Sequence, residues 1–133
     1  MEVAKVIARY VNGTALKGVT QDFFPNKDRF HLYPPSNLSG ERVEVLLKDL
    51  KAVFFVRDFE GNSQYGERKG YLDGERPAGR KVEVTFGDGE VLVGSTLGYE
   101  SSRPGFFLFP ADPQTNNVRV FAVSKAVRAV RYL

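Results

Sequence analysis

Polar and apolar residues alternate near the start of the chain and again near its middle. The alternation covers residues 5–10 (KVIARY) and residues 81–86 (KVEVTF). A period of two is typical of a β-strand with one buried face. Asn12-Gly13 and Asp88-Gly89 follow these stretches at matched positions, and such pairs supply the positive φ that tight hairpin turns require. We therefore expect two β-hairpins.

The wider pattern also occurs twice. A shift of 76 positions places residues 5–34 on residues 81–110 without a gap, and a shift of 77 places LKAVFFV (50–56) on VRAVRYL (127–133). We interpret this as an internal duplication, with a first repeat at 1–56, a linker at 57–79 and a second repeat at 80–133. A unit of roughly 55 residues is marginal alone because it buries too little surface. The two repeats are therefore expected to pack together.

The remaining elements of each repeat are also short. Gly18 and Gly94 lie in the middle of a long second strand, where glycine commonly marks a bulge or a sharp bend. A short aromatic strand follows and stops at Pro34 or Pro110, because proline cannot donate to a ladder. A fourth strand, one helical-looking turn and a fifth strand complete the repeat. The prediction is an all-β protein of two tandem, five-stranded, strongly bent barrels.

The segment 57–79 contains five glycines, mixed charge and little periodicity. A structureless stretch of this length is uncommon inside a compact domain, so it is either a tether or a binding loop. Both alternatives remain open from the sequence.

Composition excludes several classes of site. The chain has 42% apolar and 26% charged residues, no cysteine and a single histidine, His31. We expect an ordinary globular protein without disulfides, thiolate metal sites or cofactors. The N-terminus alternates charged and apolar residues instead of resembling a signal peptide, and no apolar run approaches the length of a membrane span. The expected location is the cytoplasm.

Two sequence runs resemble the Sm-like family of five-stranded barrels. They are KVIARYVNGTALKGVTQDF (5–23) and KVEVTFGDGEVLVGSTLGY (81–99), the latter followed by VRVFAVSKAVRAVRYL (118–133). The resemblance implies that each repeat is an Sm-like barrel. In that family the loops before the third and last strands hold RNA bases, but the corresponding residues 100–105 and 124–126 lack those motifs.

Two further resemblances concern function. Arg76 and Arg80, followed by Ser102 in the turn at 100–105, resemble the motif with which PilZ domains bind cyclic di-GMP. As a whole, the tandem arrangement with DFFP, LKAVFFVRDFEG, LGY, RPGFFLFPADP and VRYL resembles an uncharacterised family of small bacterial proteins, a domain of unknown function. That family implies no activity.

Three binding hypotheses follow, and each has its own candidate residues. A protein-interaction surface would use Phe107, Phe109 and Arg103, although the favoured interpretation of such rings is that they fill a barrel core or seal the interface between repeats. Weak RNA or DNA binding would use the net charge of +3 and the basic C-terminal stretch. Its candidates are Arg119, Lys125, Arg128 and Arg131. Cyclic di-GMP binding would use Arg76, Arg80 and Ser102.

An enzyme is not expected. No nucleophile and base occur at a suggestive spacing, and the Gly-x-Gly at 87–89 lies in a hairpin without a following helix. We expect a non-enzymatic binding or adaptor module. Its partner is expected to be another protein or a second copy of itself, with nucleic acid as the alternative.

Overall fold

The computed structural model describes residues 3–34, 41–61, 65–68 and 70–133. This part of the chain forms β-strands and short 3₁₀ turns, which confirms the all-β class. The first half contains β1 (Ala4–Tyr10), β2 (Ala15–Thr20), β3 (Arg29–Leu32), β4 (Val43–Leu46), the turn η1 (Leu47–Asp49) and β5 (Leu50–Val56). The second half contains β6 (Arg80–Phe86), β7 (Val91–Thr96), β8 (Gly105–Pro110), β9 (Asn117–Val123), the turn η2 (Ser124–Ala126) and β10 (Val127–Tyr132).

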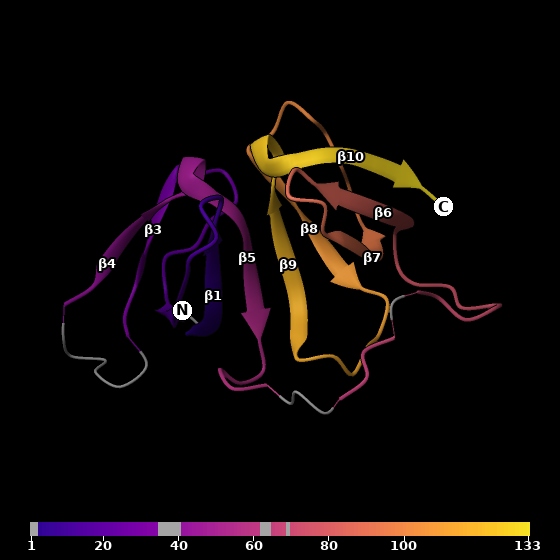
Figure 1. The fold of residues 1–133 in the computed structure, drawn as a ribbon, viewed down its shortest axis with the longest axis horizontal. Helices are drawn as coiled ribbons and strands as arrows, with labels where there is room; N and C mark the ends of the chain where they lie inside the picture. The colour runs from indigo at the N-terminus through magenta and orange to yellow at the C-terminus, as the bar shows by residue number, and fades with distance from the viewer. Residues whose placement is uncertain (1–2, 35–40, 62–64, 69) are drawn as a thin grey trace.

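The two halves are joined through one antiparallel sheet. Its strand order is β10-β6-β7-β8-β9-β5-β1-β2, and β3 and β4 form a separate two-stranded ribbon. Figure 1 shows the halves side by side, with β5 and β9 adjacent at the centre. The last strand of the first half thus pairs with the fourth strand of the second half.

The described residues do not close the barrels that the sequence predicted. The fourth strand of the second half, β9, pairs with β5 of the other half instead of with β10. In the first half, β3 reaches the main sheet at one bridge between Val19 and Tyr33. The sheets are therefore open, and the Sm-like character of each half stays a prediction.

Two hydrophobic cores lie on opposite faces of the β5–β9 pair. Val53 and Phe55 of β5 and Phe121 of β9 belong to the first-half core. Phe54 of β5 and Val120 of β9 belong to the second-half core. Successive strand residues point to opposite faces, so each of these two strands supplies both cores. This explains why the run LKAVFFV is apolar almost throughout instead of alternating.

Gly94 lies where β7 meets β8. A Cβ at Gly94 would come within 2.2 Å of the Phe109 carbonyl oxygen. The matched Gly18 has the same constraint, because its Cβ would come within 2.6 Å of the Tyr33 carbonyl oxygen. Any larger residue would push these backbones apart, so glycine is required by close approach at both positions.

We expect Gly94→Ala to destabilise the protein by about 1–3 kcal/mol, because the contact is with backbone that cannot rotate away. Gly98→Ala is the matched control, since a Cβ at Gly98 meets nothing within 4 Å. Urea unfolding followed by circular dichroism measures both variants. A Gly94→Ala protein as stable as Gly98→Ala would contradict the close-approach argument.

Candidate functional site

A cleft of about 660 Å³ lies between the two halves, and we call it the interhalf cleft. Each half contributes the loop before its third strand and the 3₁₀ turn before its last strand. The lining residues are Asn26, Lys27, Asp28, Arg29, Leu46, Leu47, Lys48, Ser101, Ser102, Arg103, Pro104, Val123, Ser124 and Lys125. The cleft exists only because β5 pairs with β9, which brings these loops to one end of the sheet.

The interhalf cleft is basic. Five of its lining residues are cationic and one, Asp28, is acidic. Asp28 is paired with Arg29 at 3.0 Å. Arg103 is paired with Glu100 at 3.3 Å, with both side chains largely exposed. The remaining cations are Lys27, Lys48 and Lys125, for which the described residues provide no ion pair. The cleft therefore presents uncompensated positive charge to a ligand.

An apolar pocket of about 420 Å³ continues from the cleft. The two share Asn26, Arg103 and Pro104. Beyond these residues the lining becomes hydrophobic and includes Leu97 and Phe109. Leu97 is 73% exposed, although it is a large aliphatic side chain. An exposed apolar wall next to a basic cleft is suited to a ligand that has both characters.

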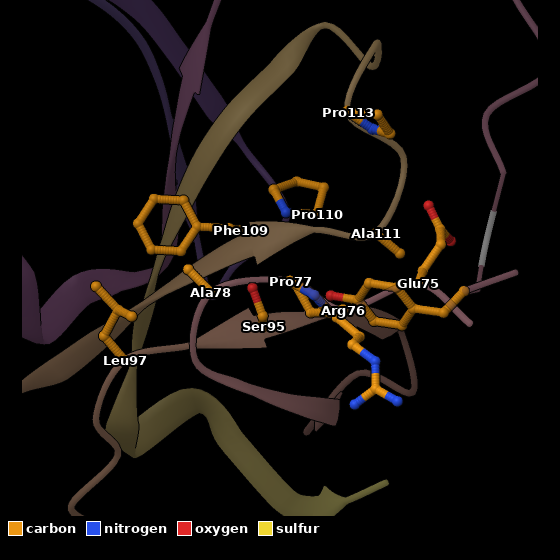
Figure 2. Close-up of a pocket in the computed structure, with 11 residues that line it drawn as sticks. Glu75, Arg76, Pro77, Ala78, Ser95, Leu97, Phe109, Pro110, Ala111 and Pro113 are labelled. Atoms are coloured by element: carbon orange, nitrogen blue, oxygen red, sulfur yellow. The ribbon is translucent and has the colours of Figure 1, made fainter. Parts of the chain in front are cut away.

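A third pocket, of about 460 Å³, lies on the far side of Leu97 and Phe109. Figure 2 shows these two residues at one end of the pocket and Glu75 and Arg76 toward the other. Leu97 and Phe109 also line the apolar pocket, so the three hollows follow one another across the surface. The linker 57–79, which we call the connector from here on, supplies one wall with Pro77 and its neighbours.

The structure does not bring the three candidate nucleotide-binding residues together. Arg76 lines the pocket of Figure 2, whereas Ser102 lines the interhalf cleft. The Arg80 guanidinium lies 4.1 Å from the centre of the Tyr132 ring in a cation–π contact. These residues thus occupy different places on the connector and the second half.

The four basic nucleic-acid candidates are also dispersed. The Arg119 guanidinium packs on the rings of Phe55 and Phe107, at 4.3 and 4.4 Å from their centres, and burial lowers its pKa. Arg131 is paired with Glu83 at 3.1 Å. The other two candidates, Lys125 and Arg128, are exposed, and Lys125 lines the interhalf cleft.

The proposed interaction residues also divide. The Phe107 ring packs against Phe23, Phe55 and Phe121, with ring centres 5.1–6.2 Å apart, so it serves the junction between the halves. Phe109 and Arg103 line hollows at the surface. Of the three, these two are placed to meet a partner.

Lys27 and Lys48 were missing from the sequence candidates. Both lie in the first half and line the interhalf cleft. Lys48 aligns with Lys125 at the shift of 77, and both lie in the 3₁₀ turn before a last strand. That match was the available signal. The pairing of β5 with β9, which brings the two turns to one cleft, could not be predicted from the sequence.

The connector is fastened to the loop between β8 and β9. Asp112 is 5% exposed, and its carboxylate accepts hydrogen bonds from the Tyr65 hydroxyl at 2.6 Å and from the backbone N–H groups of Arg68 and Gln114 at 2.9 Å. These donors lower the pKa of Asp112 to about 2, with the Tyr65 hydroxyl contributing most. Arg68 in turn pairs with Glu75. The network positions the connector wall of the pocket in Figure 2.

Comparisons with known proteins identify a family for the chain but no function. A family model whose description is a family of unknown function matches residues 2–133. This confirms the resemblance to an uncharacterised family. No curated protein and no solved structure matches the chain. Within the described residues, no helix has the length and hydrophobicity needed to cross a membrane.

The Asp112 network predicts a pH-dependent loss of stability. Its folded pKa of about 2 lies below the ordinary 3.8, so its contribution is complete above pH 4 and is lost as the pH falls toward 2. In Asp112→Asn this contribution is absent at every pH. We therefore expect the difference in urea midpoint between wild type and Asp112→Asn to shrink between about pH 4 and pH 2. Asp73→Asn, an exposed change in the same connector, is the control, and an equal response would contradict the assignment.

Proposed function

Because the chain belongs to DUF6982, a family of unknown function that brings no activity with it, we propose a function from its geometry alone. The protein is a non-enzymatic binding module, and the interhalf cleft takes an acidic segment of a partner protein. The observation that carries this proposal is the uncompensated charge of a cleft built from loops of both halves. A cleft between two packed units is a common place for a ligand.

The charge of the cleft argues for an anionic ligand. Lys48 and Lys125 belong to corresponding 3₁₀ turns and line one cleft from the two halves. Exposed ion pairs contribute only about 0–1 kcal/mol each, so the lysines provide orientation and faster association more than affinity. The affinity has to come from apolar contact.

The apolar pocket beside the cleft supplies that contact. Leu97 and Phe109 lie past Arg103 and Pro104, which line both hollows. A large apolar side chain buried there contributes about 1.5–3 kcal/mol. The favoured ligand is thus an extended segment with carboxylates on the lysines and an aliphatic or aromatic side chain against Leu97 and Phe109.

A protein segment fits these observations better than nucleic acid does. Single-stranded nucleic acid needs exposed aromatic faces for its bases beside a basic track. Phe107 and Arg119 are engaged with each other and with the junction. Arg131 is paired with Glu83. Nucleic acid and cyclic di-GMP are therefore alternatives for the experiment to separate.

The proposal also covers the fold family and the origin of each half. We propose that each half is an Sm-like unit derived by duplication. The strand order of the second half, β10-β6-β7-β8-β9, supports this, as does the same order in the first half with β3 and β4 split off. A cytoplasmic location belongs to the same proposal.

We expect a labelled peptide in which several glutamates precede a leucine and a phenylalanine to bind the wild-type protein, measured by fluorescence anisotropy. Lys48→Glu/Lys125→Glu should weaken binding at least tenfold, because two attractive contacts become repulsive. Leu97→Ser should weaken it without changing its dependence on salt.

The matched control is Arg128→Glu, an exposed charge reversal on β10 outside the cleft. It should leave peptide binding within about twofold. Tighter binding of a single-stranded oligonucleotide or of cyclic di-GMP than of the peptide would replace the protein ligand by a nucleic acid or a nucleotide. Peptide binding that is unaffected by the double lysine change would show that the interhalf cleft is not the site.

A further inference from the structure

The strands β10 and β4 correspond to the two strands that join the halves, and neither has a strand on its outer side among the described residues, so we call them the free edges. β10 occupies in the second half the place that β5 has in the first, and β4 corresponds in the same way to β9. The register agrees in detail: the β1–β5 ladder shifts between Arg9 and Tyr10, and the β10–β6 ladder shifts between Val127 and Ala129 at the matching place. The edges of β10 and β4 thus correspond in register to the strands β5 and β9 of the junction.

At the β5 side of the junction, apolar residues enter the other half. Ile7 and Phe54 are cross-strand partners, and both belong to the second-half core. At the corresponding positions of the free β10 edge stand Glu83 and Arg131, which are cross-strand partners and form an ion pair at 3.1 Å. A buried apolar pair is thus replaced by an ion pair.

At the β9 side an apolar pair is likewise replaced by a polar pair at the free edge. Phe107 and Phe121 are cross-strand partners with ring centres 5.1 Å apart, and they pack in the first-half core. The corresponding pair at the free β4 edge is His31 and Glu44, whose Nε2 and Oε2 atoms lie 4.0 Å apart, while His31 Nδ1 lies 2.6 Å from Asp22 Oδ2. Glu44 also pairs with Arg29 at 3.4 Å.

An ion pair of the junction has no counterpart at the free edges. Lys51 of β5 pairs with Asp88 at 2.7 Å and also with Glu90, both in the β6–β7 hairpin of the other half. Arg128 corresponds to Lys51, and it would meet Asn12 where Lys51 meets Asp88. The attraction between the units would be lost there.

We infer that these two pairs of polar and charged side chains stop a second copy of the chain from adding to the sheet, so that it ends after two halves. Free strand edges pair with other chains unless something prevents it, and charged side chains are one means. A second copy docking as β9 docks on β5 would have to bury Glu83 with Arg131 and His31 with Glu44. Removing such pairs from water costs more than their attraction returns unless further hydrogen bonds satisfy them.

The experiment restores the apolar pairs at one edge at a time. A β10-edge variant carries Glu83→Ile and Arg131→Phe, and a β4-edge variant carries His31→Phe and Glu44→Phe. Wild type and each variant alone should be monomeric by sedimentation velocity. An equimolar mixture of the two variants should form a one-to-one complex of doubled mass, because it offers one restored edge of each kind.

The register can be tested directly because the chain contains no cysteine. Phe55 pairs with Arg119 in the junction, so Tyr132 of one copy should lie opposite Arg42 of the other. Tyr132→Cys in the β10-edge variant and Arg42→Cys in the β4-edge variant should form an intermolecular disulfide on mixing. Lys5→Cys in place of Arg42→Cys is the control and should not crosslink.

A mixture that stays monomeric while both variants keep the circular dichroism of wild type would overturn the inference. So would crosslinking between Tyr132→Cys and Arg42→Cys when these changes are made without the edge substitutions. If a double change prevents folding, Arg131→Leu and Glu44→Leu provide a milder pair for the same mixing experiment. Neither result bears on peptide binding in the interhalf cleft, so this inference and the proposed function fail independently.

Discussion

The antiparallel pairing of β5 with β9 holds two small halves in one sheet, and the other features of the molecule follow from it. Because each strand is covered on both faces, neither core is complete without residues from the other half. Phe54 reaches the second-half core, and Phe121 reaches the first-half core. A half of this size would be marginal alone because it buries too little of its surface. By sharing the central strands, each half buries apolar surface against the other.

The same pairing determines where a ligand can be held. It brings the 3₁₀ turns η1 and η2 to one end of the sheet, so that Lys48 and Lys125 line one cleft. The Asp112 network fixes the connector on the second half and gives the pocket of Figure 2 its outer wall. Binding surfaces are thus formed where the halves and the connector meet, and not within a single half.

Local patterns predicted much of the fold. Alternation at 5–10 and 81–86 identified strands, because the period is a property of neighbouring residues. The requirement for glycine at position 94 comes instead from the close approach of the Phe109 backbone. The junction could not be predicted in this way. The run LKAVFFV indicates only a strand buried on both faces and does not identify what covers it. The candidate site could not be predicted for the same reason. Arg119 is basic in sequence yet packs on two aromatic rings, and Lys48 matters only beside Lys125.

The shared strands also set an order of events during synthesis. Sixty residues separate the end of β5 from the start of β9. At about 5–20 residues per second, the face and edge of β5 that β9 and the second half cover stay exposed for roughly 3–12 s. Throughout that interval AVFFV presents Phe54 and an unpaired backbone edge to the surrounding medium. Short apolar segments of high β-propensity are the ones that aggregate when exposed. The nascent chain is therefore most prone to aggregate between the completion of its first half and the synthesis of β9, and a chaperone would protect it most in that interval.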